Sequence, residues 1–168
     1  MRIRPEEPRD WPAVQAVNEL AFETSAEADL VAALRVRATP LVSLVAEDSD
    51  SSVAGHILFS PVTLTGHPRL KIMGLAPMAV APHRQRAGVG SMLIRAGLDE
   101  CRRLGFGAVF VLGHPSYYPR FGFTRAADFG ITCEYEVPEE AFMALELEPG
   151  YLEGASGTIR YHEAFSSL

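Results

Sequence analysis

One stretch of the chain decides its fold: Leu75-Ala-Pro-Met-Ala-Val-Ala-Pro-His-Arg-Gln-Arg-Ala-Gly-Val-Gly-Ser91. It joins an apolar strand candidate, Leu70–Val80, to a helical segment, Gly88–Leu104. The first N–H groups of a helix have no internal partners, and the helix dipole favours anions there. Gly88 and Gly90 would let a phosphate approach that backbone closely. The stretch therefore predicts a pyrophosphate-binding loop between a strand and a helix, with positive charge supplied by Arg84 and Arg86.

Two common nucleotide-binding loops lack their diagnostic residues here. A Walker A loop needs Gly-Lys-Ser/Thr, but Gly90 is followed by Ser91 and Met92. A dinucleotide fingerprint needs a third glycine, where this chain has Leu93, and an acidic residue about 20 residues further on, which is missing. The remaining alternative is that the two glycines merely shape a tight turn.

The segments around this stretch predict one α/β domain. Gly88–Leu104 carries an apolar stripe at helical spacing, and Ala108–Leu112 is a continuous apolar run of the kind found in buried strands. A strand, a helix and a buried strand in that order predict a right-handed parallel crossover. The other expected elements are helices after an Asp10 N-cap and over Ala26–Arg35, strands over Leu41–Ala46 and Val53–Leu64 forming an antiparallel hairpin, and a turn at Gly66-His67-Pro68.

Length and composition narrow the class of protein. A chain of 168 residues, 48% of them hydrophobic, fits a single domain over 1–168. No apolar run approaches the roughly 20 residues that span a bilayer, and the first residues do not resemble a signal peptide, so we expect no membrane partner and a cytoplasmic location. A net charge of −6 argues against a nucleic-acid partner. The two cysteines and five scattered histidines lack metal-ligand spacing, so no metal is expected.

The tail, residues 131–168, reads as extended, with a strand at Phe142–Leu147. Its alternation of apolar and polar residues is explained by a half-buried strand without any ligand. The aromatic residues beyond it could wall an acceptor pocket or form a subunit contact, and either a monomer or a homodimer is compatible with the sequence.

Two motifs resemble those of one known family. Gln85-Arg86-Ala87-Gly88-Val89-Gly90 resembles motif A of the GNAT superfamily of N-acetyltransferases, Gln/Arg-x-x-Gly-x-Gly/Ala. Downstream, Tyr117-Tyr118-Pro119-Arg120-Phe121-Gly122-Phe123 resembles the family's aromatic-Tyr-x-x-hydrophobic-Gly-Phe motif. The resemblance covers about residues 1–123 and is strongest to a subgroup of predicted acetyltransferases with an extended C-terminus, so 131–168 would be a family-variable extension. It implies the GNAT acyl-CoA N-acyltransferase fold, a mixed twisted sheet flanked by helices with a splayed strand pair holding the cofactor.

The resemblance also implies a site for acetyl-CoA. The pyrophosphate would lie on the amides of Arg86–Ser91, and the pantetheine arm would pair with the backbone of Met78–Val80. Pro77 cannot donate a ladder hydrogen bond, which is compatible with a bulge or splay there and equally with an ordinary edge strand. The implied cofactor-binding residues are Met78, Ala79, Val80, Gln85, Arg86, Ala87, Gly88, Val89, Gly90 and Ser91.

The expected reaction is direct transfer of acetyl to a primary amine of a small-molecule or peptide acceptor. Tyr118 matches the family's general acid, and a phenol with a pKa near 10 is protonated at neutral pH. Tyr117 is expected to pack. The strand before the loop has no carboxylate, so the general base is not identified; Glu23, Glu27, His114 and Glu134 are candidates, each also explained as a solvated or capping residue. The rival interpretation is a non-catalytic acyl-CoA-binding or sensing module on the same fold.

Overall fold

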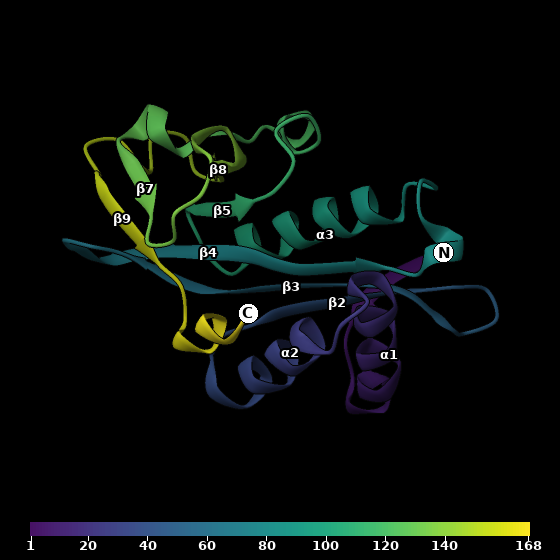
Figure 1. Ribbon diagram of the computed structural model, residues 1–168. Helices are drawn as coiled ribbons and strands as arrows, with labels where there is room; N and C mark the ends of the chain where they lie inside the picture. Colours follow the sequence, from purple (N-terminus) through teal and green to yellow (C-terminus); the bar gives the residue numbers. More distant parts are fainter.

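The computed structural model describes all residues of the chain, 1–168, and centres on a nine-stranded sheet. Helix α3 covers one face, and α1 and α2 cover the other (Figure 1). The strand order is β1-β2-β3-β4-β5-β8-β6, with β9 paired to both β3 and β7. The predicted mixed sheet flanked by helices is confirmed. The elements are β1 (Arg2–Pro5), α1 (Trp11–Phe22), α2 (Ala26–Arg37), β2 (Val42–Glu47), β3 (Val53–Leu64), β4 (His67–Val80), α3 (Val89–Arg103), β5 (Ala108–Leu112), β6 (Thr124–Arg125), β7 (Ile131–Cys133), β8 (Phe142–Glu146) and β9 (Gly157–Arg160), with short 3-10 turns η1 (Pro8–Asp10), η2 (Pro82–Arg84), η3 (Tyr118–Phe121), η4 (Ala126–Phe129), η5 (Glu139–Ala141) and η6 (Glu163–Ser167).

The sheet opens between its two central strands. β4 and β5 are parallel and stay paired only from Ile72 to Leu75 on β4. Beyond this point β5 continues against β8, with Leu112 opposite Phe142, while β4 continues against β3. Between the β3 pairs of Leu75 and Met78, β4 holds two residues where β3 holds one, so a bulge lies at Ala76–Pro77. The structure therefore has the bulge and splay with which the sequence is compatible.

Helix α3 packs tightly on the sheet through the apolar stripe that the sequence predicts. Its buried residues are Val89, Leu93, Ile94, Gly97, Leu98 and Cys101. A side chain at Gly97 would place its Cβ 2.1 Å from the Phe59 ring, so only glycine allows this approach of helix to strand. The helix ends in a Schellman motif: Gly105, with φ of 87°, donates to the carbonyl of Arg102, and the Phe106 N–H donates to Cys101 at 3.0 Å.

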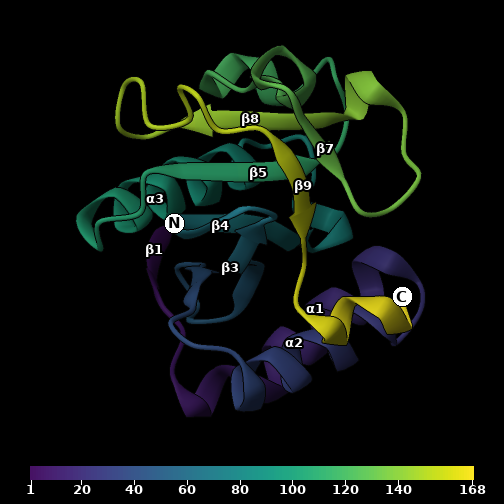
Figure 2. The same cartoon turned by 90° about the vertical axis from the view of Figure 1, so that its left-hand side faces the viewer.

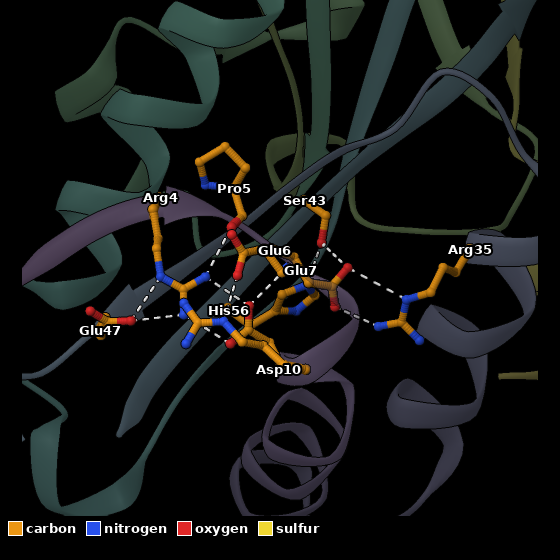
Figure 3. A network of polar contacts seen from close by, with 10 residues as sticks. Arg4, Pro5, Glu6, Glu7, Asp10, Arg35, Ser43, Glu47 and His56 are labelled. Carbon is orange, nitrogen blue, oxygen red and sulfur yellow. Dashed lines mark hydrogen bonds and ion pairs between the residues drawn. The ribbon is translucent and has the colours of Figure 1, made fainter. Parts of the chain in front are cut away.

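A polar network joins β1, β2 and the start of α1 (Figure 3). The two terminal guanidinium nitrogens of Arg4 donate to Asp10, at 2.7 and 2.8 Å, and the Arg4 Nε donates to Glu47. The hydrogen bond from Arg4 lowers the pKa of Asp10 to about 2. Asp10 precedes α1, but its carboxylate does not cap that helix and instead accepts from the Glu7 N–H. Asp10 occupies the expected N-cap position of α1, but its side chain makes no capping hydrogen bond because a buried arginine takes its oxygens.

A second branch of the network holds a histidine inside the sheet. His56 on β3 is fully buried; its Nδ1 lies 3.4 Å from Asn18 Nδ2, and its Nε2 lies 2.9 Å from Ser43 Oγ. Asn18 Nδ2 is a donor, so Nδ1 accepts and Nε2 donates. Ser43 in turn donates to Glu6, which accepts from Arg35. Desolvation by burial lowers the pKa of His56 to about 3, so the ring is neutral.

The last part of the chain is built into the sheet. β8 pairs with β5 along its whole length, and β9 pairs with the end of β3 and, in parallel, with β7. After β9 the chain crosses to the face of α1 and α2, where η6 lies beside α2 (Figure 2). The expected strand at Phe142–Leu147 is confirmed to within one residue, as β8. The turn expected at Gly66-His67-Pro68 includes Gly66, which has a φ of 80°, but it is formed by Thr65 and Gly66. His67 and Pro68 already belong to β4.

Candidate active site

The loop before α3 presents a row of free backbone amides. None of the N–H groups from Arg86 to Ser91 makes a well-formed hydrogen bond within the chain. Gly88 caps α3 with φ of 85°, and a Cβ placed there would meet nothing within 4 Å. Arg86 also has a positive φ, 65°. These amides and the helix dipole together form an anion-binding site with open space in front of Gly88.

The two arginines of the loop have different surroundings. Arg84 forms an ion pair with Asp48, in the turn between β2 and β3, so its charge is already partly neutralised. Arg86 is exposed and makes no ion pair, so its guanidinium is free to meet an anion. Of the two arginines expected to supply positive charge, only Arg86 lacks an ion-pair partner, while Arg84 fastens the loop to the neighbouring turn.

The free edge of β4 points into the opening between the strands. Ala81 donates to Ala54 on β3, and because partners alternate along an antiparallel pair, Ala79 also faces β3. The N–H and C=O groups of Met78 and Val80 therefore face the gap left by β5. One of these carbonyls is occupied, since Gln85 Nε2 donates to the Val80 oxygen at 3.0 Å. The remaining groups are free to pair with an extended ligand.

Tyr117 links the aromatic motif to the start of α3. Its hydroxyl lies 3.1 Å from the Ser91 hydroxyl, and a Cβ on Gly90 would lie 3.2 Å from the Tyr117 oxygen. Its ring packs edge-on against Tyr118 and Phe121, at centroid distances of 5.2 and 5.3 Å. The Tyr117 ring therefore packs among aromatic side chains, as the sequence predicts, and its hydroxyl also contacts Ser91 at the start of α3. Sequence reasoning missed that contact.

Tyr118 is the more buried tyrosine of the pair, with 9% of its surface exposed. Its ring packs edge-on against Phe123 at 5.7 Å and over Gly113, where a Cβ would lie 2.3 Å from the ring. Desolvation, and secondly the neighbouring Tyr117, raise the pKa of Tyr118 to about 12. The phenol is therefore protonated at neutral pH and can act as a proton donor.

The candidate bases lie apart from one another. Glu23 ends α1 in a left-handed conformation and is exposed, as is His114 in the loop after β5. Glu27 accepts from the Thr24 hydroxyl at 3.1 Å. Glu134 accepts from the Tyr161 N–H at 2.5 Å, which places it next to the tail. No hydrogen bond joins any of the three carboxylates to Tyr118, whereas the backbone carbonyl of His114 accepts from the Tyr118 N–H at 3.4 Å, which places His114 in the same turn.

The structure shows neither a cluster of metal-ligating side chains nor a membrane-spanning helix. No group of three or more His, Cys, Asp or Glu residues is placed to hold a metal ion. None of the helices has the length and hydropathy needed to cross a membrane.

Comparison with known proteins agrees with this geometry. Residues 2–126 match the family model described as "Acetyltransferase (GNAT) domain". The chain is 39% identical, over 99% of each sequence, to "Uncharacterized N-acetyltransferase YhbS" of Escherichia coli K12. The crystal structure of E. coli YhbS in complex with CoA covers 98% of this chain and 91% of that one, with 38% identity and a TM-score of 0.92. A GNAT acetyltransferase of Brucella melitensis in complex with acetyl-CoA covers 98% and 97%, with 36% identity and a TM-score of 0.81. The chain therefore belongs to the GNAT family of acetyltransferases.

Proposed function

We propose that this chain is an acetyl-CoA-dependent N-acetyltransferase that moves the acetyl group directly from the thioester to a primary amine. The observation that carries the proposal is the row of free amides from Arg86 to Ser91, which follows the strand whose bulge opens the sheet. A pyrophosphate and an extended pantetheine arm need these two features side by side. The CoA and acetyl-CoA complexes of the two GNAT relatives support the choice of cofactor.

The proposed cofactor residues form two groups, the loop before α3 and the end of β4, where Ala79 lies between Met78 and Val80 with its own backbone turned to β3. The amides of the loop would hold the pyrophosphate, with Arg86 adding charge. The free edge of β4 would pair with the pantetheine arm, and Gln85 would hold the loop against that edge. The proposed cofactor-binding residues are Met78, Ala79, Val80, Gln85, Arg86, Ala87, Gly88, Val89, Gly90 and Ser91.

The proposed chemistry forms a C–N bond and breaks the C–S bond of the thioester. The neutral amine attacks the carbonyl carbon, whose oxygen would be polarised by a backbone N–H near Met78 or Val80. The CoA thiolate leaves and takes the phenolic proton of Tyr118, which is replaced when the ammonium product releases its own proton. Tyr118 is fully protonated at neutral pH, because burial raises its pKa to about 12; proton transfer then relies on the basicity of the departing thiolate and on the position of the hydroxyl.

The environment of the cysteines supports direct transfer over a covalent acyl-enzyme. Cys101 lies on the buried face of α3, and desolvation raises the pKa of its thiol to about 12. Burial also raises the pKa of Cys133. An acyl-enzyme needs a thiolate, and neither cysteine is in an environment that forms one.

Two measurements test the proposal. Acetyl-CoA should raise the melting temperature of the protein whereas ATP and NAD should not, and Gly90→Val should abolish the shift. The fold should tolerate that change, because the added Cβ meets only the ends of the flexible Tyr117 and Met78 side chains. A shift with ATP or NAD alone would refute the cofactor assignment.

CoA release should then exceed background with at least one member of a panel of amines, amino acids and peptides. Binding of acetyl-CoA without turnover across the panel would favour the sensing module, to which the lack of a carboxylate on β4 also points.

A further inference from the structure

A largely apolar cavity lies beside the opening between β4 and β5. Its volume is about 480 Å³, within the range of small-molecule sites. The strand side is formed by Leu75, Ala76 and Leu112, and the opposite side by Tyr135, Tyr161 and Phe165 of the tail. The cavity therefore lies between the point where the sheet opens and the last 40 or so residues of the chain.

The residues that line the cavity belong to core clusters on both faces of the sheet. Leu75 belongs to the core cluster under α3, which also contains Tyr118. Phe165 and Ala76 belong to the cluster of α1 and α2 on the other face. Tyr118 does not line the cavity, but Leu75, which does, belongs to the same core cluster as Tyr118, so a ligand in the cavity would reach the opening of the sheet from the side of the tail.

The tail residues of the cavity are held in place by close packing. Gly74 on β4 lies under the Tyr161 ring, because a Cβ there would lie 2.9 Å from a ring carbon. Tyr161 stacks on Tyr135, with centroids 6.0 Å apart and planes at 27°, and lies 5.1 Å from the Phe165 ring. The walls are therefore packed aromatic surfaces, the kind that select a ligand by shape and polarity.

No charged side chain lines the cavity. Apart from Ser166, every lining residue is hydrophobic or a tyrosine. Glu134 lies next to Tyr161, but its carboxylate accepts from the backbone N–H of that residue. A second positive charge on an acceptor would lose its hydration here, and no lining side chain offers a carboxylate to pair with it, so its burial is costly. An uncharged aromatic or branched aliphatic group would instead gain from burial.

We propose that this cavity holds the apolar group of the acceptor, and that the acceptors are primary amines carrying one uncharged aromatic or branched aliphatic group. This inference rests on the proposed function, since it assigns the second substrate of the same site. It makes Leu112, Tyr135 and Tyr161 specificity-determining residues.

The test compares two acceptors in one assay of CoA release, 2-phenylethylamine and spermidine. The ratio of their kcat/KM values cancels effects on acetyl-CoA binding. We expect the ratio to favour 2-phenylethylamine by about tenfold or more in the unaltered protein. Leu112→Glu, which puts a carboxylate in the wall at a 45% exposed position, should lower the ratio by about tenfold or more. The matched control is Leu20→Glu, at a 61% exposed leucine on α1 outside the cavity, which should leave the ratio unchanged.

Two results would overturn the inference while leaving the enzyme assignment intact: a preference for spermidine, or a ratio that Leu112→Glu does not change. If octanoyl-CoA is used in preference to acetyl-CoA and Leu112→Glu removes that preference, the cavity binds the acyl chain and the inference is also wrong. Should Leu112→Glu fail to fold, Tyr135→Ala, at a 37% exposed residue, replaces it with the same expectation.

A binding measurement separates the two proposals when there is no turnover. 2-Phenylethylamine is titrated calorimetrically into the protein saturated with CoA. Heat of binding that is lost in Leu112→Glu supports the cavity assignment even though the enzyme assignment has failed. Absence of binding to the unaltered protein overturns the cavity assignment.

Discussion

Replacing Tyr118 with Phe separates the proposed chemistry of the hydroxyl from the packing of the ring. The ring contacts Phe123 and Gly113, and those contacts are carbon contacts that Phe keeps. The hydroxyl has no hydrogen-bond partner that influences its pKa. We therefore expect the free energy of unfolding to change by less than about 0.5 kcal/mol.

The same substitution should have a large effect on turnover. Loss of a positioned general acid costs about 100-fold in kcat, equivalent to about 2.7 kcal/mol of transition-state stabilisation. The KM for acetyl-CoA should change little, because the free amides at the start of α3 are untouched. Since the pKa of Tyr118 is raised to about 12, the rate of the unaltered protein should show no alkaline loss from this group below about pH 11.

Tyr117→Phe is the matched control, because it removes the neighbouring hydroxyl from the same aromatic cluster. That hydroxyl is hydrogen-bonded to Ser91 at 3.1 Å, so its loss should cost about 1 kcal/mol of stability and change kcat only a few-fold. Stability is measured by urea denaturation, and kcat by CoA release with the best acceptor of the panel. The reasoning is refuted if Tyr118→Phe keeps more than half of kcat, or if Tyr117→Phe shows the larger loss of turnover.

Three further expectations concern binding and stability. Arg86→Gln should weaken acetyl-CoA binding about fivefold, as measured by calorimetry. Arg84→Gln should weaken binding by a smaller factor, because the Arg84 guanidinium is paired with Asp48. Equal losses of affinity would contradict the different roles of the two arginines. Gly97→Ala should lower the free energy of unfolding, measured in urea, by about 1–3 kcal/mol, because the new Cβ would lie 2.1 Å from the Phe59 ring. This loss should outweigh the higher helix propensity of alanine. A stabilised variant would show that the helix can shift. The pKa of His56 is about 3 in the folded protein and about 6.5 in the unfolded chain. As pH falls below about 6.5, the imidazole is therefore protonated in the unfolded chain but stays neutral in the folded protein. Stability should therefore be full above pH 6.5 and fall by about 1.4 kcal/mol per pH unit below it, and His56→Gln should flatten that slope in denaturation series from pH 7 to 4.5.

Much of the fold follows from local sequence signals. The apolar stripe of α3, the glycines at both of its ends and the continuous run of β5 each indicate their element without knowledge of the rest. These elements are long or strongly patterned, so their periodicity dominates over alternatives. The short parallel pair β7 and β9 could not be predicted, because each strand is only three or four residues long and the pairing joins segments far apart in the chain.

The candidate site also has some parts that local sequence signals predict and others that they do not. The loop amides follow from the glycines and the helix start, which are local. The Tyr117 contact with Ser91 depends on the direction in which the η3 turn points its side chains, which no spacing rule gives. The pairing of Arg84 with Asp48 could have been anticipated, since β3 runs antiparallel to both β2 and β4, so the β2–β3 turn and the end of β4 lie at one end of the sheet.

The place of β8 in the sheet has a practical consequence for protein production. The family match ends at residue 126, which makes that position an inviting place to shorten the chain. A chain ending there would lack β8, and β5 would expose a row of unsatisfied N–H and C=O groups beside an apolar core. Bare strands of this kind recruit other chains, so such a fragment should aggregate rather than fold as a smaller enzyme.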